Sequence, residues 1–147
     1  MALKGDRTVV ATEMKFVAAS QAMTAGGIVS VDTAASGNET TVSYAENPSG
    51  ALPVGVLTVN VGDYDWTDRP RFVEKPDVAY GEQLGLITIG QVRTKMIAAG
   101  VTASVGQTAY LAASGMISNV QASGAPEIGQ FMSEADSDSY YYVDIRC

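Results

Sequence analysis

The chain of 147 residues contains no histidine, and its single cysteine, Cys147, is the last residue. A Ser-His-Asp or Cys-His catalytic relay needs a histidine, and zinc sites of the cysteine/histidine type need several such side chains. A lone cysteine cannot form a disulfide within its own chain. Carboxylate, lysine or tyrosine chemistry remains open. The composition therefore favours a protein that is not an enzyme and that holds no metal and no cofactor.

Basic residues are also scarce: the chain has nine Lys and Arg and sixteen Asp and Glu, which gives a net charge of -7 at pH 7. Phosphate backbones repel such a chain, so a nucleic acid is not an expected partner. The acidity is typical of a surface that keeps a protein in solution.

Long apolar runs are absent as well. No segment approaches the length of a transmembrane span, and the first residues, Met1–Arg7, lack the apolar stretch of a signal peptide. We therefore expect a product of the cytoplasm with no membrane partner.

The sequence does contain short apolar runs separated by glycine-rich turns, a pattern that predicts strands. The Ala-rich stretch Val17–Ala25 has room for one or two helical turns before Gly26 and Gly27 end them. The expected strands are Thr8–Ala11, Lys15–Ala18, Gly27–Val31, Thr40–Tyr44, Val54–Val61, Gln83–Ile89, Gln91–Ile97, Ala109–Leu111, Glu127–Met132 and Tyr140–Ile145. So many short strands predict an all-β fold, a small β-barrel or a jelly-roll-like sandwich.

Two of these runs alternate clearly between apolar and polar positions. In Gln91–Ile97, the side chains of Val92, Thr94 and Met96 share one face. In the last strand, Tyr141, Val143 and Ile145 share a face, which leaves two further tyrosines, Tyr140 and Tyr142, on the outside. Outward tyrosines either stabilise a cross-strand pair or belong to a contact surface.

A weak internal echo links Leu52–Leu57 with Ala125–Phe131. Both segments place a proline shortly before an apolar residue and a glycine that open a strand. The echo is too short to predict a repeat architecture, and a shared way of turning into a strand explains it.

Acidic residues cluster twice. Glu134, Asp136 and Asp138 alternate with small residues, but the loop glycine and distal glutamate of a calcium loop are missing, so a solvated turn is the simpler interpretation. Asp63, Asp65 and Asp68 surround Tyr64 and Trp66, the only tryptophan. A carboxylate pair beside aromatic rings would also suit sugar binding or glycoside hydrolysis.

The segment 62–82 is a long excursion of mixed charge. Aromatic and arginine side chains, which interface centres favour, are concentrated in it, and loops of this length are usually functional or disordered. The alternative is an Ω-loop packed on its own chain. The predicted partner-binding residues are Tyr64, Trp66, Arg69, Arg71 and Phe72, together with Tyr140 and Tyr142.

The order of several short motifs carries a family resemblance. Gly81–Val92 is followed by Val105–Ile117, which contains Ala109-Tyr110-Leu111-Ala112-Ala113-Ser114-Gly115, then by Ile128-Gly129-Gln130-Phe131 and a final Tyr142-Val143-Asp144-Ile145. Over residues 24–146 the chain resembles the β-rich decoration, or cement, proteins of tailed-phage capsids.

The resemblance implies a virion structural protein without catalytic residues. Such a protein binds the outer surface of the phage head, holds neighbouring major capsid protein subunits together, and is a homo-oligomer, a dimer or a trimer. The expected core covers residues 24–147, with the long loop at 62–82. Residues 1–23, which the resemblance does not cover, are an expected N-terminal arm, because the short runs Thr8–Ala11 and Lys15–Ala18 have strand character. This arm either pairs with a neighbour or completes its own barrel. The rival functions are a carbohydrate-binding or appendage domain that uses Trp66 and neighbouring tyrosines, and a carboxylate-based hydrolase.

Overall fold

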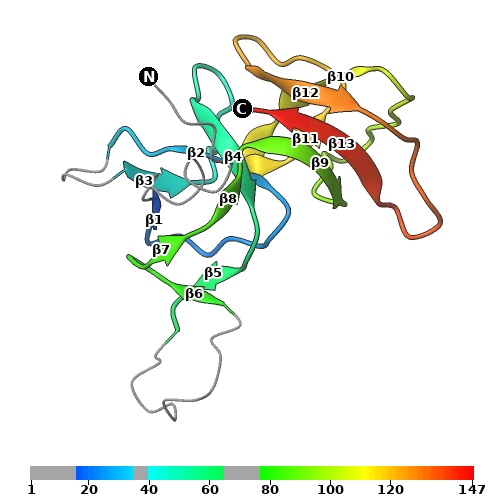
Figure 1. The fold of residues 1–147 in the computed structure, drawn as a ribbon. Helices are drawn as coiled ribbons and strands as arrows, with labels where there is room; N and C mark the ends of the chain where they lie inside the picture. Colours follow the sequence, from blue (N-terminus) through cyan, green and yellow to red (C-terminus); the bar gives the residue numbers. More distant parts are fainter. Residues whose placement is uncertain (1–15, 35–39, 65–76) are drawn as a thin grey trace, which may run out of the picture.

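A computed structural model describes residues 16–34, 40–64 and 77–147 of the chain. Within these ranges the regular structure consists of strands β1 to β13 and one short 3-10 turn, Ala113–Gly115, with no α-helix. Eleven of these strands form two curled sheets that lie next to each other, and the other two form a small separate pair (Figure 1). The prediction of an all-β fold is confirmed.

The first sheet has six strands in the order β7-β1-β3-β2-β4-β8. Its two edge strands follow one another in the chain with only Gly85 between them, so the sheet curls until its edges nearly meet. A small parallel pair, β5 and β6, adjoins it. The strands are β1 (Phe16–Ala18), β2 (Ile28–Val31), β3 (Thr40–Ser43), β4 (Pro53–Leu57), β5 (Val61–Gly62), β6 (Val78–Ala79), β7 (Gln83–Leu84) and β8 (Leu86–Ile87).

The second sheet has five strands in the order β11-β10-β12-β13-β9 and curls into a half-barrel. Its alternation agrees with the sequence: Tyr141, Val143 and Ile145 are buried, whereas Tyr142 is exposed. The strands are β9 (Ile89–Thr94), β10 (Thr108–Leu111), β11 (Ile117–Ser118), β12 (Glu127–Phe131) and β13 (Tyr141–Arg146).

Two strands expected as single runs are each divided. Val54–Val61 becomes β4 and then β5, because the chain leaves the first sheet after Leu57 and pairs Val61 with Val78. Gln83–Ile89 is broken at Gly85, since β7 pairs with β1 whereas β8 pairs with β4. Strands β6 and β11, two residues each, were not expected, because runs that short carry no periodic signal.

The predicted N-terminal arm, residues 1–23, is described from Phe16 onward. Strand β1 lies between β3 and β7, and Met23 is part of the first core, so over 16–23 the chain completes its own sheet. The helical turns considered for Val17–Ala25 do not form, because strand pairing takes up Val17 and Ala18. Residues 1–15, with the expected strand Thr8–Ala11, lie outside the described residues and stay a predicted arm.

The two sheets contain the same four-strand unit. The order β3-β2-β4-β8 in the first matches β11-β10-β12-β13 in the second. In both units the register shifts at the same place, between Val29 and Ser30 in β2 and between Ala109 and Tyr110 in β10. The parallel pairing of β1 with β3 also recurs, as the bridge between Ile97 and Ile117.

Backbone hydrogen bonds repeat with the strands. The N–H of Gly26 donates to the carbonyl oxygen of Leu57 at 2.8 Å, and that of Gly106 donates to Phe131 at 2.8 Å. The turns before β4 and β12 match as well, with φ +70° at Gly50 and +73° at Gly124. The similarity between Leu52–Leu57 and Ala125–Phe131 is therefore part of a duplicated structural unit. Loops of unequal length make this duplication hard to see in the sequence. We call β1 to β8 the first module and β9 to β13 the second module.

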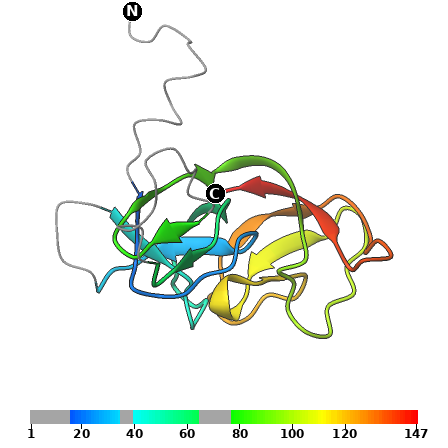
Figure 2. The same ribbon diagram turned by 90° about the horizontal axis from the view of Figure 1, so that it is seen from below.

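Each module has a hydrophobic core, and the pair β2–β4 contributes to both. Val29 and Leu57 are buried in the core of the first module. Ile28 and Val56, on the other face of the same strands, are buried in the core of the second module, which also contains Phe131. Figure 2 shows the two sheets side by side, with the chain from β8 to β9 passing from one to the other.

We expect the substitution Gly129→Ala to destabilise the fold by about 2–4 kcal/mol. Gly129 has a φ of +152°, and a Cβ there would overlap the backbone carbonyl oxygen of Asp144 on the neighbouring strand. Gly100→Ala is the control, because Gly100 has a φ of +77° but open space around it. Urea unfolding should give a loss of about 1 kcal/mol for the control. Equal losses for the two variants would contradict this account of Gly129.

Candidate functional site

A groove of about 630 Å³ lies between the two modules. One wall comes from Val56, Leu57 and Ile87 of the first module, and the opposite wall is residues 91–96 of the second. The groove forms because β8 pairs with β4, whereas β9, continuing the same chain, pairs with β13. The two strands diverge from that point, and the space between them is not filled by described side chains.

Strand β9 presents a backbone edge to this groove. Within the described ranges it pairs with β13 alone, and its residues 91–94 line the groove together with Lys95 and Met96, which follow the strand. Because side chains alternate between the faces of a strand, consecutive residues meet one groove along the strand's edge. Such an edge can accept another extended segment through main-chain hydrogen bonds.

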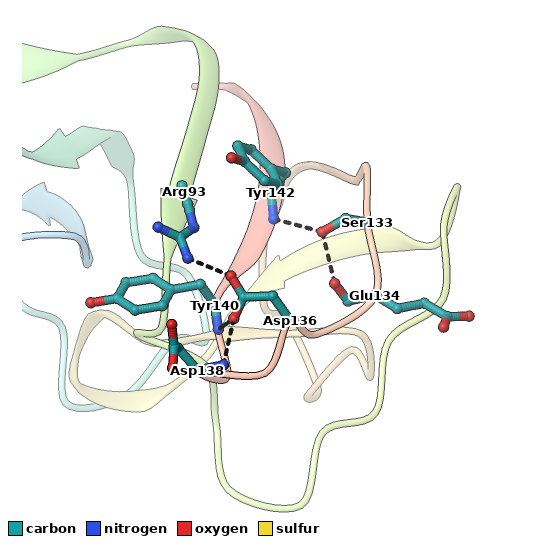
Figure 3. A network of polar contacts seen from close by, with 7 residues as sticks. All are labelled: Arg93, Ser133, Glu134, Asp136, Asp138, Tyr140 and Tyr142. Carbon is teal, nitrogen blue, oxygen red and sulfur yellow. Dashed lines mark hydrogen bonds and ion pairs between the residues drawn. The ribbon is translucent and has the colours of Figure 1, made fainter.

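Tyr140 stands at the groove with two cations over its ring. The guanidinium carbon of Arg93 lies 4.4 Å from the ring centroid and the Lys95 ammonium 5.2 Å from it. Arg93 also forms an ion pair with Asp136, at 2.5 Å between nitrogen and oxygen (Figure 3). In a chain of net charge -7, Arg93 and Lys95 make this rim locally basic.

The acidic turn between β12 and β13 holds Asp136 and Tyr140 in place. One carboxylate oxygen of Asp136 accepts the backbone N–H groups of Asp138 and Tyr140, each at 2.9 Å. The hydrogen bond from Arg93, and then that from the Tyr140 backbone, hold the pKa of Asp136 below its ordinary value. The cluster Glu134, Asp136 and Asp138 is thus an exposed turn. No group of three or more potential metal ligands occurs in the part of the chain that the structure describes.

Tyr142 is the most exposed of the neighbouring tyrosines, with 45% of its surface accessible. Its backbone N–H donates to Ser133 Oγ at 3.0 Å, and that hydroxyl donates to the Glu134 carbonyl oxygen at 2.8 Å (Figure 3). These bonds fix the backbone beside the side chain. Tyr140 and Tyr142, which the sequence places on one outer face, do flank the same ion pair.

Tyr64 lies apart from the groove, in a pocket that also includes Thr24, a residue shared with the groove. The pKa of its hydroxyl is raised above the ordinary value of 10.0. Burial is the main cause, and the negative charge of Asp77 is the next. The other predicted partner-binding residues, Trp66, Arg69, Arg71 and Phe72, lie outside the described residues. Asp65 and Asp68 lie outside them too, so the acidic cluster that includes Asp63 is described only in part.

Sequence reasoning missed the groove and the roles of Arg93 and Lys95. The signal was present, since two cations alternate along the exposed face of one strand in an acidic chain. What the sequence could not show is that β8 and β9 diverge, because that depends on which strand each one pairs with. No helix within the described ranges has the length and apolar character needed to cross a bilayer.

We expect Arg93→Gln to raise the pKa of Asp136 towards its ordinary value of 3.8, because Arg93 is the main cause of its lowered pKa. A carboxyl-carbon NMR titration measures this shift, with Lys95→Gln as the control that leaves it in place. Since folding lowers this pKa, the pair contributes stability above pH 3.8 that is lost as pH falls through the folded-state value. An unchanged Asp136 titration in Arg93→Gln would show that the ion pair does not persist in solution.

Comparisons with known proteins bear on the fold. No family model and no curated protein matches the sequence. Among solved structures, the chain is similar to the crystal structure of the N base of head fiber gp8.5 in bacteriophage phi29, with 15% sequence identity and a TM-score of 0.51. The similarity covers 89% of this chain and 90% of that one. At this identity the similarity shows that the two chains share a fold.

Proposed function

We propose that this protein is a virion structural protein of a tailed phage, carried on the outer surface of the head and bound to the major capsid protein. The supporting observation is the fold it shares with the phi29 head fiber base over 89% of its length. The decoration-protein resemblance of residues 24–146 points to the same place in the virion. In this proposal the chain is made in the host cytoplasm and acts as a homo-oligomer, a dimer or a trimer.

The composition supports an exterior position and a role without catalysis. A net charge of -7 does not suit contact with packaged DNA, and the absence of histidine removes the commonest general acid and base. The proposed role is mechanical. A protein that binds only the assembled shell stabilises that shell by its own binding free energy, and many copies on one lattice add avidity.

The proposed capsid contact combines Tyr140 and Tyr142 with the loop residues Trp66 and Arg71. Tyrosine and arginine are residue types that carry binding energy at interfaces, and here the exposed Tyr142 and the half-buried Tyr140 lie beside Arg93. The free edge of β9 adds main-chain donors and acceptors for an extended segment of the capsid protein. For carbohydrate binding, the alternative function, Tyr140 is poorly placed, because Arg93 and Lys95 already lie over its ring.

Binding to purified heads that lack the protein tests the proposal. We expect the double variant Tyr140→Ala/Tyr142→Ala to bind heads about 30-fold more weakly, which corresponds to about 2 kcal/mol at one hot spot. Val120→Ala is the control, because Val120 is 70% exposed and lies away from the groove. Co-sedimentation gives the affinity, and a melting curve shows that each variant is folded.

A second double variant, Trp66→Ala/Arg71→Ala, tests in the same assay whether the loop, rather than the tyrosines beside the groove, contacts the capsid. Weaker binding by either double variant identifies the contact. Normal binding by both would place the capsid contact elsewhere, and no binding by the unaltered protein would overturn the proposed function.

A further inference from the structure

Strand β9 directs some of its backbone groups away from its only partner strand within the described ranges, β13. Just before β9, the N–H of Cys147 donates to the carbonyl oxygen of Thr88 at 3.0 Å. Hydrogen bonds to one neighbour involve every second residue of an antiparallel strand, so every second residue from Thr88 onward bonds to β13. The residues between them direct their N–H and C=O groups to the free edge: Ile89, Gln91 and Arg93.

The other neighbour of β13 supports this alternation. The N–H of Met132 in the turn after β12 donates to the carbonyl oxygen of Tyr142 at 2.8 Å. Tyr142 lies opposite Arg93 and directs that carbonyl away from β9. Outside the ladder with β13, no backbone hydrogen bond joins Ile89, Gln91 or Arg93 to another described residue. Their N–H and C=O groups are therefore open to an added strand.

The free edge ends where the two modules touch. The hydroxyl of Thr94 donates to the carbonyl oxygen of Gly26 at 2.8 Å and accepts the N–H of Met96 at 3.0 Å. This contact joins the second module to the first, so the open edge runs from Ile89 to Arg93. An added strand of about five residues fits along it, at about 3.4 Å per residue.

Among the described residues, two cations and no carboxylate line the groove beside this edge. Arg93 and Lys95 are both exposed there, although the chain as a whole has a net charge of -7. Arg93 is paired with Asp136, whereas Lys95 forms no ion pair with any described residue. A segment bound next to these side chains is attracted if it is acidic and repelled if it is basic. The groove therefore favours an acidic partner.

The two faces of an added strand would have different surroundings. Side chains opposite Val92 would point the same way as Val92, towards the core that also contains Val56. Ile87, which is 37% exposed, stands on the same wall of the groove as Val56. Side chains opposite Gln91 and Arg93 would point outward, next to the cations. The edge thus favours apolar residues on one face of the added strand and acidic residues on the other.

We propose that the free edge of β9 binds an extended segment of the major capsid protein in which acidic residues alternate with apolar ones. The main chain of that segment pairs with Ile89, Gln91 and Arg93, its apolar side chains enter the groove, and its acidic side chains lie next to Arg93 and Lys95. This inference rests on the proposed function for the identity of the partner. It adds the register and the chemistry of the contact.

The N-terminal residues of this chain also have strand character, but their charge does not complement the groove. Within residues 1–15, the run Thr8–Ala11 contains no acidic side chain. The charged side chains of residues 1–15 are Lys4, Arg7 and Lys15 with Asp6 and Glu13. Basic residues are in excess, so charge complementarity favours a partner chain over this segment.

Proline in the free edge tests the main-chain pairing. We expect Gln91→Pro to bind purified heads about 10-fold more weakly, because proline removes an N–H that faces the added strand but leaves the ladder with β13. Gln91→Ala is the matched control, since it shortens the same side chain and keeps the N–H. Ile89→Pro is a second variant at the first residue of the strand, where proline is tolerated, in case Gln91→Pro melts early. Co-sedimentation gives the affinity, and a melting curve shows that each variant is folded.

Charge reversal tests whether the bound segment is acidic. We expect Lys95→Glu to weaken head binding about 10-fold at low salt, with a smaller difference as the NaCl concentration rises. Arg146→Glu is the matched control, because it makes the same change in net charge at an exposed residue that does not line the groove. Equal losses for the two variants would contradict an acidic segment in the groove.

A photo-crosslinking amino acid in place of Gln91 identifies the bound segment on decorated heads. We expect mass spectrometry to find a peptide of the major capsid protein with alternating acidic and apolar residues. A crosslink to residues 1–15, to another part of a second copy, or to a capsid peptide without acidic residues would overturn the proposal. No binding of heads by the unaltered protein would overturn the proposed function and this contact with it. Unchanged binding by Gln91→Pro and Lys95→Glu would overturn the contact alone.

Discussion

The two modules are held together by one pair of strands whose side chains are buried on both faces. Val29 and Leu57 on one side, and Ile28 and Val56 on the other, belong to separate cores. Burying each such side chain stabilises the fold by about 1.5–3 kcal/mol. Because β2 and β4 form a layer common to both cores, neither module can lose this pair and keep its packing. The groove between the modules also depends on this layer, since Val56 and Leu57 line it.

Tyr44 lies where the two modules meet and makes both hydrogen bonds and packing contacts there. Its hydroxyl donates to the Thr24 carbonyl oxygen and accepts the N–H of Gly27 at 3.2 Å, while its ring packs on Gly115 of the second module. Burial raises the pKa of this hydroxyl to about 12. Since folding raises the pKa above 10.0, the neutral hydroxyl contributes stability below that pH, and the contribution is lost as the pH rises towards 12. A glycine is required at position 115, because a Cβ would overlap the ring.

The sequence predicted the strands that alternate and the turns that contain glycine, because both are local properties. Tyr141, Val143 and Ile145 are buried as their spacing predicts. Gly55 and Gly129, the glycines of the two similar segments, each lie close to the backbone of a neighbouring strand. The duplication escaped detection because the matched strands β2 and β10 share no residue at equivalent positions. The groove could not be predicted either, since it arises from the pairing of β8 and β9 with different strands. For Trp66, Arg69, Arg71 and Phe72 the sequence is still the only guide.

The chain from Leu86 to Thr94 has a mechanical consequence. It is anchored at one end to β4 and at the other, over six register pairs, to β13. A pull along this segment that drags the modules apart would load the β9–β13 ladder in shear, so that its hydrogen bonds resist together rather than opening one after another. A pull across the strands would instead open the same ladder from one end. The molecule is therefore expected to resist stretching along this segment and to open more easily when it is pulled across the strands. This difference in stiffness follows from the path of one strand.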